Sequence, residues 1–132
     1  MPFSDVRDLS AAHALVRDSG AANAGILIDT LHFNRSPSTL AQLESVPKAL
    51  FHYAQLNDAA HIENPTTDQL LKTAREERLY LGEGVIPVRE IVNLLPDVPL
   101  SLEIAHVERQ RELGFEEFAR TCLQRAKLYF GQ

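Results

Sequence analysis

The sequence has little cysteine, no run of basic residues and no long apolar stretch. A single cysteine, Cys122, can form no disulfide within the chain. The 13 Lys and Arg residues do not cluster and the net charge is −5, so the basic surface that nucleic-acid binding requires is missing. No apolar stretch approaches the roughly 18 residues of a membrane-spanning helix. We therefore expect neither a nucleic acid nor a membrane as a partner.

The rest of the composition is that of an ordinary globular domain. The segment Met1–Asp5 lacks the charged and then apolar pattern of a signal peptide, which predicts a cytoplasmic protein. Cys122 falls on the apolar face of a predicted helix, so we expect a buried thiol and not a nucleophile. Residues 1–132 suffice for one domain with a core, whereas a closed α/β barrel of eight strands usually needs about 250 residues.

Three short apolar segments each carry a polar residue that could bind a metal ion. The segments span 24–32, 51–58 and 99–104, and their polar residues are Asp29, Gln55 and Glu103. Short apolar runs bounded by turns are typical of buried parallel strands. The carboxyl ends of such strands face one crevice, where ligands bind. Three oxygen-bearing side chains, one per strand, predict the divalent-metal site of an enzyme.

Helical patterns alternate with these strands. We expect helices at 5–19, 36–47, 67–77 and 87–95, and a last helix after the third strand whose apolar stripe runs from Phe115 to Tyr129. Alternation of strands and helices predicts an α/β fold with a parallel sheet and right-handed crossovers.

Four local motifs follow one another in a fixed order along the chain. They are Asp29-Thr-Leu-His32-Phe, Tyr53-Ala-Gln55-Leu-Asn-Asp58, Arg78-Leu-Tyr-Leu-Gly82-Glu-Gly84 and Ser101-Leu-Glu103-Ile. In this order the chain resembles the sugar phosphate isomerase/epimerase superfamily, the xylose isomerase-like TIM barrels that include hydroxypyruvate isomerases and ketose 3-epimerases. The resemblance implies that Asp29, Gln55 and Glu103 end strands six, seven and eight and bind the metal. His32 and Arg78 match positions that contact the substrate.

The resemblance covers only part of a barrel. The family's first metal ligand is a Glu that ends strand five, just upstream of a segment like Met1–Ser4. By this match, residues 1–132 are the C-terminal portion of a (β/α)8 TIM barrel without strands one to five. Three explanations stay open: the sequence is a fragment, the gene is truncated, or a partner chain supplies the rest. We expect self-association or pairing with the missing N-terminal half, and little activity from the chain alone.

The ligand set predicts the chemistry. Hard oxygen ligands suit Mg²⁺, Mn²⁺ or Co²⁺, and such an ion would stabilise the enediolate that forms when a hydroxy-ketone loses a proton. Glu103 would also act as the catalytic acid/base, while His32 would hydrogen-bond the substrate and Arg78 would hold a polar or anionic end. The resemblance implies a sugar (phosphate) or hydroxy-keto acid isomerase or epimerase of carbohydrate metabolism. A lyase of the dehydroshikimate dehydratase kind and a non-catalytic fragment are the alternatives.

Structural roles stay open for several of these residues. Asp29 could cap a loop, Gln55 could be a satisfied core amide, and Arg78 could end a solvated helix. Asp58 could line the crevice or cap a loop. Glu103, between two apolar neighbours, is expected to be buried, and a buried charge is costly unless it is paired or bound to a metal.

Overall fold

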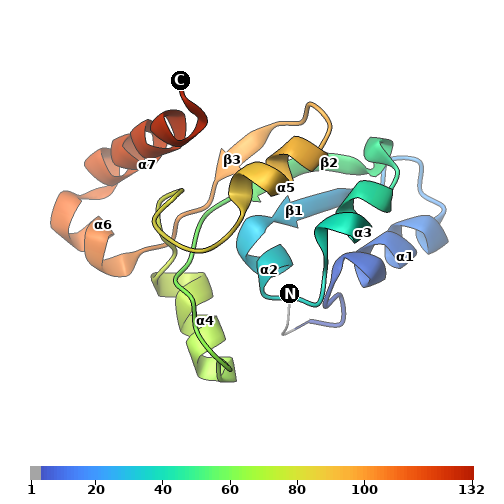
Figure 1. Ribbon diagram of the computed structural model, residues 1–132, viewed down its shortest axis with the longest axis horizontal. Helices are drawn as coiled ribbons and strands as arrows, with labels where there is room; N and C mark the ends of the chain where they lie inside the picture. Colours follow the sequence, from blue (N-terminus) through green and yellow to red (C-terminus); the bar gives the residue numbers. More distant parts are fainter. Residues whose placement is uncertain (1–3) are drawn as a thin grey trace. The chain divides into compact units, whose positions relative to one another are not determined.

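The computed structural model describes residues 4–132, so the predicted match of Met1–Phe3 to the segment after strand five lies outside the described residues. In chain order the elements are α1 (Leu9–Ser19), β1 (Ile26–Asp29), α2 (Thr30–Asn34), α3 (Leu40–Ser45), the 3-10 helix η1 (Lys48–Leu50), β2 (Phe51–Leu56), α4 (Thr67–Glu76), α5 (Val88–Leu94), β3 (Leu100–Leu102), α6 (Val107–Leu113) and α7 (Phe115–Phe130) (Figure 1). None of the helices described is both long enough and apolar enough to cross a membrane.

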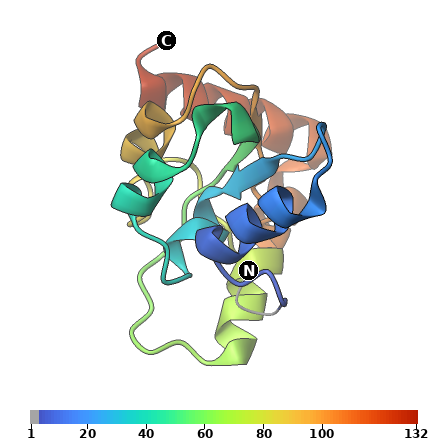
Figure 2. The same ribbon diagram turned by 90° about the vertical axis from the view of Figure 1, so that its right-hand side faces the viewer.

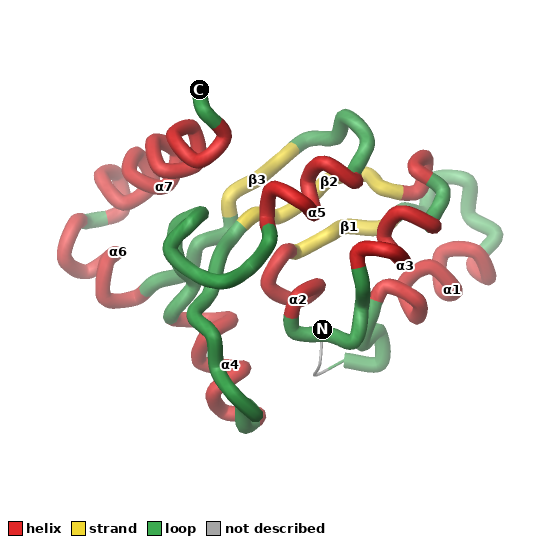
Figure 3. The backbone as a smooth tube through the Cα atoms, in the orientation of Figure 1, coloured by secondary structure: helices red, strands yellow, loops and turns green. Residues whose placement is uncertain are grey.

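The three strands form one sheet in the order β1-β2-β3, so neighbours in space are also successive in sequence (Figure 3). β1 and β2 pair in parallel. Between β2 and β3, the Ala54 N–H donates to Pro99 O and the Glu103 N–H donates to Leu56 O, each at 3.1 Å. The paired positions advance in the same direction along both strands, as in a parallel pair. The predicted α/β class with parallel strands and intervening helices is confirmed.

The chain divides into two compact units. The first comprises Met1–Gln55 and Pro87–Ser101, and the second comprises Leu56–Ile86 and Leu102–Gln132. Helices α1, α2, α3 and α5 belong to the first unit, and α4, α6 and α7 belong to the second.

A helical layer covers one face of the strands in the first unit. α3 packs against both α1 and α5, and α1 also packs on β1; Figure 2 shows α1 (blue) and α3 (teal) side by side. On β1, Ile26 and Ile28 are buried while Leu27 between them is 36% exposed. Leu27 stands opposite Tyr53 in the ladder, and Tyr53 is 39% exposed. Because side chains alternate along a strand, the face bearing these two residues is the open one.

Helix boundaries follow the capping residues. α1 begins at Leu9, later than predicted, because the Asp8 side chain and not Asp5 caps it by accepting from the Ala11 N–H. Gly20 has a left-handed φ of 63° and ends α1 at Ser19, the predicted last residue of this helix. The predicted apolar stripe from Phe115 to Tyr129 lies within α7, and α6 is a separate helix before it, because Gly114 between the two has a φ of 75°.

The core of the second unit contains a cluster of four buried residues. They are Tyr80, Ile104, Phe118 and Cys122, and the Tyr80 and Phe118 rings lie 5.9 Å apart between centroids. Cys122 is 7% exposed and forms no disulfide, as the sequence predicted.

The Cys122 thiol should react slowly with Ellman's reagent in the folded protein. Burial raises the pKa of this thiol, so less of the reactive thiolate is present at neutral pH. We expect labelling of the native chain to be roughly tenfold slower, or slower still, than labelling of the urea-unfolded chain at the same pH. Equal rates in the two states would contradict the buried placement of Cys122.

Candidate active site

Two of the predicted metal ligands lie opposite each other at the carboxyl ends of β1 and β2. Asp29 is the last residue of β1, and the parallel ladder pairs it with Gln55. Residues paired in this way project from the same face of the sheet on strands about 5 Å apart. Asp29 is 7% exposed and Gln55 is half-buried. The register therefore places a carboxylate next to an amide at the predicted end of the sheet.

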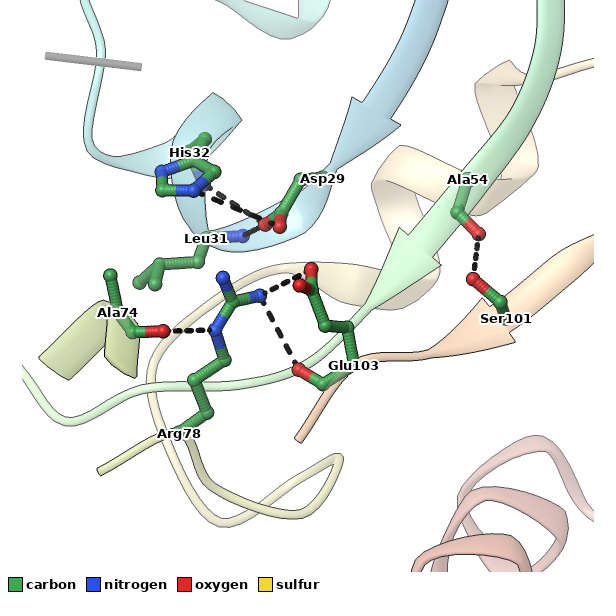
Figure 4. A network of polar contacts seen from close by, with 8 residues as sticks. All are labelled: Asp29, Leu31, His32, Ala54, Ala74, Arg78, Ser101 and Glu103. Atoms are coloured by element: carbon green, nitrogen blue, oxygen red, sulfur yellow. Dashed lines mark hydrogen bonds and ion pairs between the residues drawn. The ribbon is translucent and has the colours of Figure 1, made fainter. Parts of the chain in front are cut away.

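Asp29 also begins the next helix. Its Oδ1 accepts from the Leu31 N–H at 2.9 Å and from the His32 N–H at 3.2 Å, and its Oδ2 lies 3.9 Å from His32 Nε2 (Figure 4). The predicted strand through His32 thus ends at Asp29, because the carboxylate caps α2 at once. A carboxylate has about four lone-pair sites, so the capping role and a ligand role are compatible.

Glu103 pairs with Arg78 in the second unit. Arg78 Nη1 donates to Glu103 Oε2 at 3.0 Å and to Glu103 O at 3.3 Å, and Arg78 Nε donates to Ala74 O at 2.8 Å (Figure 4). The Arg78 side chain is 5% exposed, so the interpretation of Arg78 as a solvated helix end is wrong. The Glu103 side chain is 43% exposed, so the prediction that Glu103 is buried is wrong as well. Its charge is compensated by a buried guanidinium and needs no metal to explain it.

The structure therefore brings the predicted residues together in two groups. Asp29, Gln55 and His32 lie together in the first unit, and Arg78 and Glu103 lie together in the second. The convergence of Asp29, Gln55 and Glu103 on one ion stays a prediction. Within residues 4–132, no group of three or more His, Cys, Asp or Glu side chains is arranged to hold a metal ion.

Asp58 has a structural role that the sequence left open. Its Oδ1 accepts from the N–H groups of Ala59 at 2.8 Å and Ile86 at 3.0 Å. Its Oδ2 accepts from the N–H groups of Gly82 at 3.0 Å and Gly84 at 2.9 Å. Asp58 is 1% exposed; its bonds to Ala59 and Ile86 are buried, and its bonds to Gly82 and Gly84 are part-buried. Of the two interpretations, loop capping is correct, and the loop it caps comes 24 to 28 residues later in the chain.

Comparison with known proteins supports the fold. No protein-family model matches the sequence, and no curated protein sequence is significantly similar to it. The structure is similar to the IolI protein crystallised with a bound zinc atom, at a TM-score of 0.71 and 19% identity, over 96% of this chain and 46% of that chain. It is also similar to a xylose isomerase-like TIM barrel/4-hydroxyphenylpyruvate dioxygenase fusion protein, at a TM-score of 0.66 and 20% identity, over 76% of this chain and 16% of that chain.

The chain thus spans less than half the length of either solved protein. Its backbone has the fold of part of a TIM barrel, as predicted.

Proposed function

We propose that this chain is part of a divalent-metal-dependent isomerase or epimerase that acts on a sugar (phosphate) or hydroxy-keto acid through an enediolate. The observation that carries this proposal is the register of Asp29 and Gln55 at the carboxyl ends of β1 and β2, with Glu103 directly after β3. Active sites of TIM barrels lie at this end of the strands. The bound zinc atom of the IolI protein supports a divalent ion in this fold.

The donor set fits such an ion. Two carboxylates and an amide are hard oxygen ligands. Such ligands suit Mg²⁺, Mn²⁺ or Co²⁺ better than the thiolate ligands of a thiolate-rich zinc site would. The bonds of Asp29 to the start of α2, and of Glu103 to Arg78, fix the two carboxylates in place and still leave lone pairs for a cation. When bound, the ion would polarise the substrate carbonyl.

The side chains of this chain would perform the proton transfer and the positioning. A carboxylate oxygen of Glu103 would take the proton from the carbon next to the substrate carbonyl and return it to the neighbouring position. Arg78 would orient that carboxylate, because its Nη1 already contacts both Oε2 and the main-chain oxygen of Glu103. His32, the third residue of α2, would hydrogen-bond a substrate oxygen.

We also propose that the chain works together with the remaining strands of a barrel. The substrate pocket of a TIM barrel is built from the loops of all eight strands. β1 and β3 are the outer strands of the sheet that residues 4–132 form, and outer strands can pair with further strands. Either a second copy or the complementary half of a barrel would cover them.

Mn²⁺ affinity of the chain tests the metal site. Asp29→Asn keeps an oxygen that can cap α2 but removes the negative charge, so we expect Mn²⁺ affinity to fall roughly tenfold with little loss of stability. Gln55→Leu should weaken binding in the same direction. Glu44→Gln removes an exposed charge on α3 and serves as the matched control. Equal Mn²⁺ affinity in Asp29→Asn and Glu44→Gln, measured by calorimetry, would remove Asp29 from the site.

A further inference from the structure

The backbone around Arg78, the partner of Glu103, is held by hydrogen bonds to two other parts of the second unit. The Arg78 N–H donates to Ala105 O at 2.9 Å. The next residue, Leu79, exchanges two backbone hydrogen bonds with Asp58, at 2.8 and 3.1 Å. An arginine side chain has many rotamers, so the direction of its guanidinium depends on how firmly its backbone and its neighbours are held.

Tyr80, two residues after Arg78, is held by a charged pair. The Tyr80 N–H donates to Glu83 Oε2 at 3.3 Å, and the same oxygen accepts from Arg109 Nη1 at 2.7 Å. The Arg109 guanidinium also stacks on the Tyr80 ring, with its central carbon 4.4 Å from the ring centroid. Arg109 therefore holds Tyr80 twice, directly at the ring and through Glu83 at the backbone.

Arg109 and the anchor of the Arg78 backbone belong to neighbouring parts of the chain. Arg109 is the third residue of α6, which begins at Val107, and Ala105 lies two residues before this helix. The segment Arg78–Tyr80 is thus fastened at its first residue just before α6 and at its last residue by a side chain of α6. The Arg109 and Glu83 side chains are only 28% and 31% exposed, so solvent screens their attraction less than it screens a pair on the open surface.

We propose that Arg109 is a positioning residue for Glu103, acting through Tyr80 and Arg78. This inference rests on the proposed function, in which Glu103 is the base. Arg78 Nη1 donates to Glu103 Oε2 at 3.0 Å, so a shift of the Arg78 backbone would move or release that carboxylate (Figure 4). A base must lie within about 3 Å of the proton that it removes, and a small displacement therefore costs rate.

Hydrogen exchange of the Arg78 Nε–H in the isolated chain tests the positioning without metal or substrate. This group donates to Ala74 O at 2.8 Å, and its NMR signal reports how firmly the guanidinium is held. In Arg109→Met, which keeps an unbranched apolar stem, exchange should become roughly tenfold faster. Arg111→Met removes an exposed arginine of the same helix and should leave the rate unchanged. Equal rates in the two variants would overturn the proposal.

Two further variants separate positioning from a general loss of stability. Arg109→Lys keeps a positive charge opposite Glu83 and should bring the exchange rate back to within about threefold of the unmodified chain. Glu83→Gln keeps an oxygen for the Tyr80 N–H but removes the charge, so exchange should again become faster even if Arg109→Met fails to fold. An exchange rate in Glu83→Gln equal to that of the unmodified chain would overturn the role of the charged pair.

The consequence for catalysis is tested in a completed barrel. Arg109→Met should lower kcat for proton exchange roughly tenfold and change KM by less than about twofold, since the base and not the substrate contacts are displaced. An unchanged kcat, or an effect on KM alone, would overturn the positioning role. If the unmodified barrel turns over no hydroxy-ketone, the proposed function is refuted, and the exchange measurements on the isolated chain still decide whether Arg109 holds Arg78.

Discussion

Replacing Asp58 by alanine should destabilise the protein severely. The substitution leaves four N–H groups without their acceptor, two of them in buried bonds and two in part-buried bonds, and each unsatisfied buried donor costs about 1–3 kcal/mol. Water entering the space would offset part of this loss, so we expect the free energy of unfolding to fall by roughly 3–5 kcal/mol. A small domain has only about 5–15 kcal/mol in total, so the variant should be close to unfolding. Urea denaturation followed by circular dichroism measures the change.

Two further variants identify the cause. Asp58→Asn keeps the volume but turns an NH₂ group toward two N–H donors, so it should be nearly as destabilising as alanine. Asp97→Ala removes an exposed carboxylate and should change stability by no more than about 0.5 kcal/mol. A stable Asp58→Asn variant would show that the volume of the side chain at position 58, and not its acceptance of four N–H hydrogen bonds, stabilises the loop.

Turnover should depend almost entirely on Glu103 once the barrel is complete. The isolated chain would hold the ion by three ligands and offer only a few of the pocket's loops, so we expect almost no activity from it. Joined to a segment that supplies the remaining strands of a barrel, the chain should exchange the substrate proton next to the carbonyl with deuterium from solvent. Glu103→Gln should slow this exchange by roughly 10²–10⁴-fold, since it removes the base and weakens a ligand.

The matched control for this prediction is Glu108→Gln, which removes an exposed carboxylate at the start of α6. Its exchange rate should equal that of the unmodified protein. Full activity of the isolated 132 residues would show that the site needs no further ligand. An active Glu103→Gln variant would remove Glu103 from the role of base.

The sequence predicted the three strands, because short apolar runs bounded by turns are typical of buried parallel strands. Asp29 and Gln55 are paired in the parallel register. This pairing followed from the rule that parallel strands present their carboxyl ends at one edge of the sheet. The exposure of Glu103 could not be predicted in this way, because apolar neighbours in sequence do not fix the direction of the side chain between them. Its partner Arg78 is 25 residues away in the chain.

The loop contacts of Asp58 were beyond prediction for the same reason. They join residues 24 to 28 positions apart, and no periodic pattern reports such a contact. The one local signal is the glycine pair Gly82 and Gly84, which indicates a backbone that something approaches closely. The separate helix α6 was not predicted, because the apolar stripe that indicated the last helix lies entirely after Gly114.

The most direct test of the central claim is the paramagnetic effect of Mn²⁺ on the NMR spectrum of the labelled chain. At substoichiometric Mn²⁺, the side-chain carboxyl and amide signals of Asp29, Gln55 and Glu103 should broaden together, before those of exposed carboxylates such as Glu44 and Asp97. Nearby ring signals of His32 should follow. Broadening that spares any one of the three ligands, or that begins at the exposed carboxylates, would contradict a single metal site at the carboxyl ends of the strands.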